Sequence, residues 1–328
     1  MLQFTYRPQA PATRRERAGT LPTWSPYDPI EGRPPLKWPG GARVAVWICP
    51  NVLLYEPDPP RDAWLNAWSR TAAPDVLAFG RQEYGPRVGF WRMLEVLDKH
   101  RARCSAVVNS AALAAYPDIR AAAVARGWDF IGHGIANTRF IYGLDEAQER
   151  AYWREMRDGV EQLTGVRMAG TGGPGPQAAT ESTPDLLAEE GFLYHGDWFH
   201  DDQPFPLRVR AGKLISMPYA QETNDAPFFG AAFEADQFAD ACCRQFDRLY
   251  EEGAHSGRVF CLSVHPALIG QPQRIAAFDR VLSHVLSHPL IWQATGAEIA
   301  GWYMTNCHDA MLAHACGSGK AARQGGDA

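Results

Sequence analysis

The chain has 328 residues, of which 46% are hydrophobic and 21% are charged, and its formal net charge is −5. This composition is that of an ordinary globular protein, with enough chain to bury a sizeable core. The weak negative charge provides no field for phosphates, so nucleic acid and anionic membranes are poor partners. No apolar run reaches membrane-spanning length, and no signal-peptide pattern opens the sequence. Seven cysteines without regular spacing indicate reduced thiols and a cytoplasmic location.

Residues 1–41 are rich in Pro, Arg and Gly, and they are expected to form an N-terminal arm that is partly extended or disordered. Such an arm would wrap its own barrel or a neighbouring subunit. Residues 53–84 have no clear period but several aromatic residues. They are expected either to wall a substrate site or to pack as a surface excursion.

Apolar runs typical of buried parallel strands alternate with amphipathic helices over residues 42–304. The predicted strands are residues 43–52, 104–108, 128–131, 166–169, 192–194, 213–219, 258–264 and 291–293. The predicted helices are residues 86–100, 117–126, 145–164, 183–190, 236–250 and 274–288, with a last helix from about Thr295. Seven to eight strands in such alternation predict a single α/β domain, a catalytic (β/α) barrel, followed by a C-terminal tail over residues 305–328.

Polar residues that turn chemistry does not explain follow successive strands. They are Asn51, Asn109, His133, Asp197, Glu222, Asn224 and His265. The carboxyl ends of barrel strands meet at one rim, so these side chains predict an active site there. His133 stands between Gly132 and Gly134, which allow a sharp turn at the end of its strand. A lone histidine of this kind could instead be a hydrogen-bonded core residue.

The residues at this rim favour hydrolysis of a carbonyl compound. Histidines move protons near neutral pH, and asparagine side chains or the amides of the loop Gly170–Pro176 can stabilise an oxyanion. The sequence has no Gly-x-Ser-x-Gly elbow and no dinucleotide fingerprint. A serine hydrolase and a nicotinamide enzyme are therefore not indicated.

Six motifs over roughly residues 22–303 resemble the allantoinase-like branch of the polysaccharide deacetylase (NodB-homology) superfamily. They are Tyr84-Gly-Pro-Arg-Val-Gly-Phe-Trp91, Gly127-Trp-Asp-Phe-Ile-Gly-His-Gly134, Thr183-Pro-Asp-Leu-Leu-Ala-Glu189, Asp197-Trp-x-x-Asp-Asp-Gln-Pro204, Thr223-Asn-Asp225 and His265-Pro-x-x-Ile-Gly-Gln-Pro272. The resemblance implies a distorted (β/α) barrel. The branch includes metal-independent allantoinases and cyclic imide hydrolases, which open ring amides in the cytoplasm, commonly as homotetramers.

The sequence departs from this family at its site. The superfamily has an Asp-Asp pair, for base and metal, where this chain has Pro50-Asn51, and the branch has Ile-Glu-His where this chain has Val52-Leu53-Leu54. Asn137 stands in place of the second histidine of the metal motif, and a neutral amide is a poor zinc ligand. The pocket is therefore expected to be more apolar, and to favour a less polar cyclic amide or imide over allantoin.

We therefore expect a cytoplasmic amidohydrolase that cleaves a C–N bond of a small cyclic amide, imide or ureide without a cofactor, as a dimer or tetramer. In the expected reaction, His133 and His265 transfer protons, and the carboxylate of Glu222 or Asp201 supports them. Asn51, Asn137 and Asn224 orient the substrate or stabilise the oxyanion, and Asn109, Asp197 and Trp198 complete the substrate-binding set.

Two alternatives remain open from the sequence. One is a metal-dependent polysaccharide or N-acetyl deacetylase, in which His133, His265, Asp197 and Glu222 would be ligands if they met. The other is a catalytically inactive binding homologue, which the leucines after Asn51 favour. Elsewhere, His284 and His288 lie one helical turn apart, and they are expected to form a solvated helix face rather than a metal site.

Overall fold

The computed structural model describes residues 24–58, 74, 76–141, 143–174 and 179–324. Its strands form one curled sheet in the order β6-β7-β5-β4-β3-β2-β1-β8, with β9 pairing beside β1. The pairs are parallel except for β6–β7, which is antiparallel. The strands are β1 (Val44–Val52), β2 (Ser105–Val108), β3 (Asp129–Gly132), β4 (Gly170–Thr171), β5 (Tyr194–His195), β6 (Phe205–Leu207), β7 (Leu214–Ser216), β8 (Arg258–Val264) and β9 (Ile291–Gln293). This half-barrel confirms the predicted distorted (β/α) barrel.

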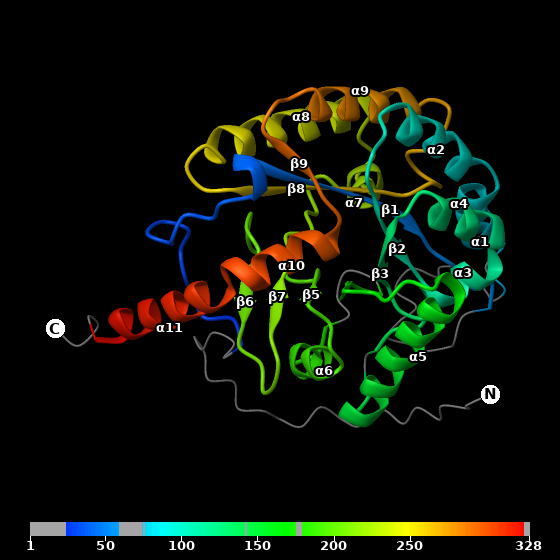
Figure 1. Ribbon diagram of the computed structural model, residues 1–328. Helices are drawn as coiled ribbons and strands as arrows, with labels where there is room; N and C mark the ends of the chain where they lie inside the picture. The colour runs from blue at the N-terminus through cyan, green and yellow to red at the C-terminus, as the bar shows by residue number, and fades with distance from the viewer. Residues whose placement is uncertain (1–23, 59–73, 75, 142, 175–178, 325–328) are drawn as a thin grey trace.

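Helices surround the sheet, with α8, α9 and α2 along one side and α5 and α6 along the other (Figure 1). The helices are α1 (Val76–Tyr84), α2 (Phe90–Lys99), α3 (Ser110–Ala115), α4 (Pro117–Ala125), α5 (Glu146–Thr164), α6 (Thr183–Glu189), α7 (Asp225–Gly230), α8 (Ala235–Glu252), α9 (Ile275–Leu286), α10 (Gly296–Asn306) and α11 (His308–Gln324). Two shorter elements are the 3-10 turn η1 (Pro39–Gly41) and the π-helical turn η2 (Gly85–Gly89). None of the helices in the described part of the chain is both long and apolar enough to cross a membrane.

Strand β1 is buried on both faces, which explains its continuous apolar sequence. Val44, Val46 and Ile48 belong to the core cluster shared with the surrounding helices. The alternate residues Ala45, Trp47 and Cys49 belong to a second cluster on the inner face of the sheet. Helix α10 adds its own residues, Ile299, Ala300 and Tyr303, to that inner cluster. Because side chains alternate along a strand, the residues that follow these inner positions, such as Asn51, also face inward.

The helix ends follow the signals in the sequence. Asp145 and Gln148 form the predicted capping box at the start of α5, and Gly165 ends that helix with a left-handed φ of 71°. Thr295 likewise caps α10 through its side chain. Each such cap contributes about 1 kcal/mol to stability.

The described part of the N-terminal arm lies on the chain's own barrel. The ring of Trp24 lies 4.2 Å from that of Trp198, and Arg33 pairs with Asp201 at 2.7 Å. Residues 1–23 of the predicted arm lie outside the described residues. The predicted tail, residues 305–328, contains helix α11, which packs beside the unpredicted strand β6.

Candidate active site

The ends of strands β3, β4 and β5 form a row at the carboxyl edge of the sheet. The register pairs Gly132 with Thr171, and Thr171 with His195. The next residues, His133 and the loop after Thr171, therefore lie side by side. Nδ1 of His133 lies 2.6 Å from the carbonyl oxygen of Gly172. The order of strands thus brings together a histidine and the glycine-rich loop that were singled out in the sequence.

Asp197 lies against the same loop. Its Oδ1 accepts a hydrogen bond of 2.7 Å from the backbone N–H of Gly173. Its Oδ2 lies 3.3 Å from Nε2 of His195, but neither of these buried atoms makes a hydrogen bond within the described residues. Nδ1 of His195 is in turn held 2.8 Å from the hydroxyl of Thr171. A buried carboxylate oxygen with no donor is a group that a ligand or water can satisfy.

Gly173 shows why this loop needs glycine. Its φ is +78°, and a Cβ built there would lie 2.1 Å from Cε1 of His133. Both the backbone conformation and the space exclude a larger residue. The loop can therefore approach the imidazole closely, and that approach fixes the orientation of the ring.

His265 forms a second centre with Asp225, the first residue of α7. Nδ1 of His265 lies 2.6 Å from Oδ1 of Asp225, and its backbone N–H lies 3.0 and 2.9 Å from the two carboxylate oxygens. The Asp225 side chain is fully buried. A buried carboxylate on Nδ1 holds an imidazole in one tautomer and stabilises its protonated form. The arrangement can therefore accept a proton on Nε2 and return it.

Asn51 lies beside His265 because the register pairs Pro50 with Val264. Its amide donates to the carbonyl oxygens of Cys49 and Val264 and, at 2.9 Å, to the hydroxyl of Ser263. The hydroxyl of Tyr219 donates to its Oδ1 at 3.3 Å and lies 2.5 Å from the Ser263 hydroxyl. The Asn51 side chain is therefore held rigidly at the rim.

The segment after β1 is fastened to the end of β3. The side chain of Asn109 donates to the carbonyl oxygen of His133 and accepts from the N–H of Leu54 at 2.9 Å. The N–H of Asn137 donates to the carbonyl oxygen of Leu54 at 2.9 Å. The structure thus uses Asn109, predicted to bind substrate, to join two backbone segments.

A pocket opens between this segment and His265. Among the residues that line it are Asn51, Leu53, Tyr55, Tyr116, His265 and Pro266. Leu54, by contrast, packs against the main core. Burial raises the pKa of the Tyr55 phenol to about 12, so the group stays neutral at physiological pH. The described wall is therefore mostly apolar, and the lining residues that carry polar side-chain groups are Asn51, Tyr55, Gln82, Tyr116 and His265.

Burial dominates the electrostatics of His133. Desolvation lowers its pKa to about 4, with nearby His265 lowering it further and Asp197 opposing the shift. His133 is therefore neutral at pH 7. Burial alone would raise the pKa of Asp197, but His195 and the Gly173 amide outweigh it and lower that pKa, so this carboxyl is ionised.

The structure also describes the two carboxylates predicted to support the histidines, Asp201 and Glu222. Asp201 is ion-paired with Arg33, and the N–H of Val259, at the amino end of β8, donates to the carbonyl oxygen of neighbouring Asp202. His265 follows the carboxyl end of β8, whereas Asp202 lies beside its amino end, and the catalytic role of Asp201 stays a prediction. Glu222 is exposed and raises the pKa of Asp202 among other causes, of which burial is the largest.

Asn224 and Trp198 complete the predicted set. The side chain of Asn224 accepts from the N–H of Ala226 and so caps α7, which makes its role local. Nε1 of Trp198 is buried without a hydrogen-bond partner among the described residues, and its ring lies 5.9 Å from that of His195. Trp198 thus places an unsatisfied donor near Asp197.

The sequence prediction missed Asp225, although the motif Thr223-Asn-Asp225 contains it. Its partner His265 is 40 residues away, so no local pattern joined the two. It also missed Tyr55 and Tyr219. The tyrosines gave no signal, because aromatic residues after a strand are ordinary core residues.

The side chains present do not form a metal site at this rim. In the described part of the chain, the one group of three His, Cys, Asp or Glu side chains with ligand atoms close enough for an ion is Asp247, His284 and His288. His133, Asp197 and His265 form no such group, and Asn137 offers a neutral amide. The donor set therefore does not fit the metal site of the wider superfamily.

Comparison with known proteins finds relatives named as deacetylases and as an allantoinase. A Schizosaccharomyces pombe protein named "Putative polysaccharide deacetylase" is 25% identical over 307 residues, covering 83% of this chain and 92% of the relative. The structure of a "probable Polysaccharide deacetylase" from Pseudomonas aeruginosa is 29% identical, with a TM-score of 0.73, and covers 84% of this chain and 95% of the other. That of PuuE allantoinase is 28% identical, with a TM-score of 0.74 and the same coverage. No family profile matches the chain. The chain is thus similar in sequence and fold to proteins named polysaccharide deacetylases and to an allantoinase, as the resemblance to the NodB-homology superfamily predicts.

Proposed function

We propose that the protein is a hydrolase that opens the ring of a small cyclic amide, imide or ureide by cleaving its C–N bond. Its relatives support the general class of reaction, which is hydrolysis of carbon–nitrogen bonds other than peptide bonds. The proposal that the substrate is a small cyclic amide rests chiefly on the pair of Asp225 and His265, which lies at the edge of a mostly apolar pocket.

In this proposal His265 transfers the proton. Asp225 holds Nδ1–H, so Nε2 carries the lone pair and can take a proton from the water that attacks the ring carbonyl. The imidazolium, stabilised by the carboxylate, then protonates the leaving ring nitrogen. This geometry allows both steps without a second acid.

His133 has a different part. Its Nδ1–H donates to the carbonyl oxygen of Gly172, which leaves the lone pair on Nε2. With a pKa of about 4 the ring is a weak base, so it accepts hydrogen bonds rather than protons at neutral pH. The Asn137 side chain is hydrogen-bonded to the His133 ring, so a ring N–H of the substrate would compete with that amide for the imidazole, whereas the ionised Asp197 has an oxygen without a donor among the described residues. These acceptors suit an imide or amide N–H better than an anionic substrate.

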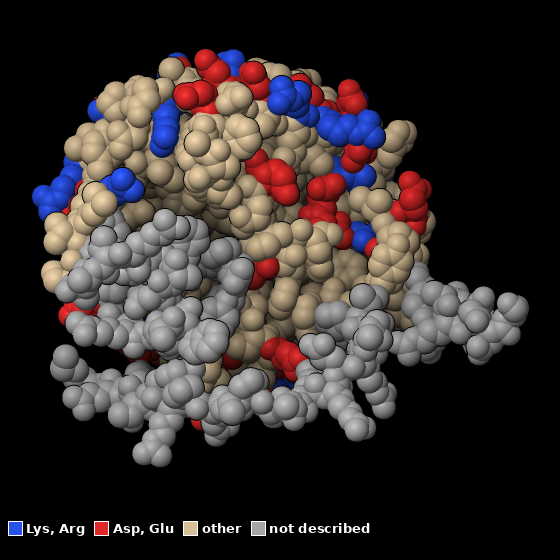
Figure 2. Space-filling view, turned by 180° about the vertical axis from the view of Figure 1, so that it is seen from behind, with Lys and Arg blue, Asp and Glu red and all other residues tan. Residues whose placement is uncertain are grey.

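Leu53 is expected to determine which cyclic amides the pocket binds best. It lines the pocket where the branch has a carboxylate. Each N–H or C=O of a ureide left without a partner there costs about 1–3 kcal/mol. Two such losses reduce binding by roughly a hundredfold. Less polar imides gain instead from contact with leucine. Figure 2 shows acidic and basic side chains interspersed along the upper edge of the face that it draws.

We further propose that the reaction needs no metal at this rim, because Asn51 and Asn137 occupy positions where ligands would be expected. We also propose that the protein is a cytoplasmic homo-oligomer.

A screen for turnover tests the class of reaction. Purified protein is incubated separately with succinimide, glutarimide, hydantoin, allantoin and an N-acetylglucosamine oligomer. Ring-opened acid is measured for the cyclic compounds and free acetate for the sugar. We expect the imides to be turned over, with kcat/KM above that for allantoin. The second candidate function is that of a deacetylase, which the names of two relatives support. Release of acetate without opening of any ring would favour it. Binding without turnover of any compound would indicate an inactive homologue.

A further inference from the structure

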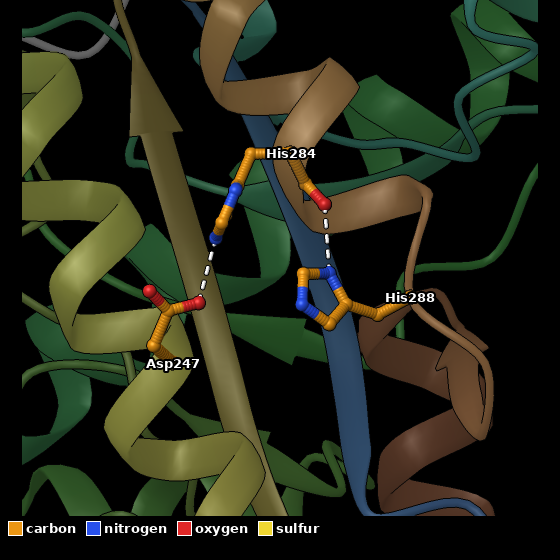
Figure 3. Close-up of side chains that lie close together, drawn as sticks. All are labelled: Asp247, His284 and His288. Atoms are coloured by element: carbon orange, nitrogen blue, oxygen red, sulfur yellow. Dashed lines mark hydrogen bonds and ion pairs between the residues drawn. The ribbon is translucent and has the colours of Figure 1, made fainter.

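A cluster outside the active site has the composition of a metal centre. Asp247 on α8, His284 on α9 and His288 just after α9 each offer one ligand atom, and these atoms lie within 4.8 Å of one another. Figure 3 shows the three side chains turned toward a common space. Two imidazoles and one carboxylate are a ligand set that zinc takes in proteins. We propose that Asp247, His284 and His288 bind a divalent zinc-like ion at the junction of α8 and α9.

The hydrogen bonds of the cluster already suit an ion. Nδ1 of His288 lies 2.8 Å from the backbone carbonyl oxygen of His284, so it carries the proton and leaves Nε2 as the acceptor. Metal-bound histidines are oriented in this way by a carbonyl on the other ring nitrogen. Nε2 of His284 lies 2.6 Å from Oδ1 of Asp247. An ion would displace the proton between these two atoms and bind both of them.

The surroundings hold the ligands in place. The ring of His288 packs 4.9 Å from Phe246 and 5.1 Å from Tyr250, and the Tyr250 hydroxyl donates to the carbonyl oxygen of Pro289. Ligand atoms around tetrahedral zinc are roughly 3.3 Å apart, given bonds of about 2.0–2.1 Å. To bind one ion, the most distant ligand atom must move inward by about 1.5 Å, and Nε2 of His284 and Oδ1 of Asp247, now 2.6 Å apart, must separate by about 0.7 Å. The proposal goes beyond the expected solvated helix face, with which the exposure of His284 and Asp247 agrees.

The cluster lies too far from His265 for its side chains to take part directly in the proposed reaction. Arg43 stacks over Tyr250, and its N–H donates to the carbonyl oxygen of Leu290, so the cluster lies near the start of β1. Arg258 at the start of β8 pairs with Val44. His265 follows the other end of β8, about 20 Å away over seven residues. The ion would instead link two helices and stabilise the folded chain.

Zinc titration of the metal-free full-length protein, in competition with a chromophoric chelator, tests the proposal. We expect one ion per chain, a higher melting temperature with zinc, and a loss of affinity of at least about tenfold in both His284→Gln and His288→Gln. His100→Gln is the matched control, because His100 lies at the same 2.6 Å from a carboxylate, Asp279, without a second histidine.

The control variant should bind zinc as the wild type does. Melting temperatures measured in chelator show whether each variant is folded before zinc is added. Equal zinc affinity in wild type, His284→Gln and His288→Gln would overturn the proposal, as would a wild-type protein that binds no zinc below about millimolar concentration. Asp247→Asn, which keeps both imidazoles, provides a milder second test.

Discussion

Substitution of Asp225 by Asn tests whether the carboxylate activates His265. The substitution keeps the size of the side chain but removes the charge next to Nδ1, now 2.6 Å away. A hydrogen bond to a charged group contributes about 1.5–3 kcal/mol, so a stability loss of that order is expected. The loss in turnover should be larger, on the order of 10³–10⁴-fold, because the amide favours the wrong tautomer and cannot stabilise the imidazolium.

The assay measures kcat and KM with the best cyclic substrate, and the free energy of unfolding in urea. KM should change little, because Asp225 is buried behind His265. Asp279→Asn is the control, since Asp279, on α9, is paired with His100 at the same 2.6 Å but is partly exposed. A double variant of Asp225→Asn and His265→Ala should be no slower than His265→Ala alone. An Asp225→Asn enzyme that kept more than about a tenth of wild-type kcat would refute the reasoning.

Three other predictions concern the active site and the α8–α9 cluster. Gly173→Ala should reduce kcat more than tenfold with a smaller loss of stability, because a Cβ 2.1 Å from His133 displaces that ring; wild-type kinetics would show that the ring is not held by this loop. Because the pKa of His133 is lowered to about 4 on folding, the unfolded chain takes up a proton below about pH 6.5 while the folded chain does not. Stability should therefore fall as pH drops from about 6.5 to about 4, by at most about 3 kcal/mol from this group, and urea unfolding of His133→Gln should show a shallower dependence on pH. Removal of metal by a chelator should lower the melting temperature through the α8–α9 cluster but leave kcat unchanged; activity lost with the metal and restored by zinc would contradict the proposed reaction.

The fold could be predicted because its signals are local. Continuous apolar runs such as Val44–Val52 identify strands buried on both faces, and capping residues such as Asp145 identify helix ends. Alternation along β1 also places Asn51 on the inner face. Parallel strands bring their carboxyl ends to one edge, so the proximity of His133 and the glycine-rich loop could be expected from strand order.

The pairing of side chains could not be predicted in the same way. Asp201 lies in a loop that also contains Asp197 and Asp202, and such a group of carboxylates is typical of an active site. Its side chain is nevertheless paired with Arg33, which is 168 residues away in the N-terminal arm. Asn109 and Asn224 follow strands as predicted, yet they serve backbone groups nearby. Such choices depend on distances between segments that are remote in sequence, and no spacing or period records those distances.

The central claim is that a neutral cyclic amide is opened at His265. The most direct measurement is the appearance of the ring-opened acid from succinimide or glutarimide, compared between wild-type protein and His265→Ala. We predict turnover by the wild type and a loss of most activity in the variant, which remains folded at the assay temperature although it loses the bond to Asp225. Equal rates of ring opening by the two proteins, or no ring-opened product from the wild type, would contradict it.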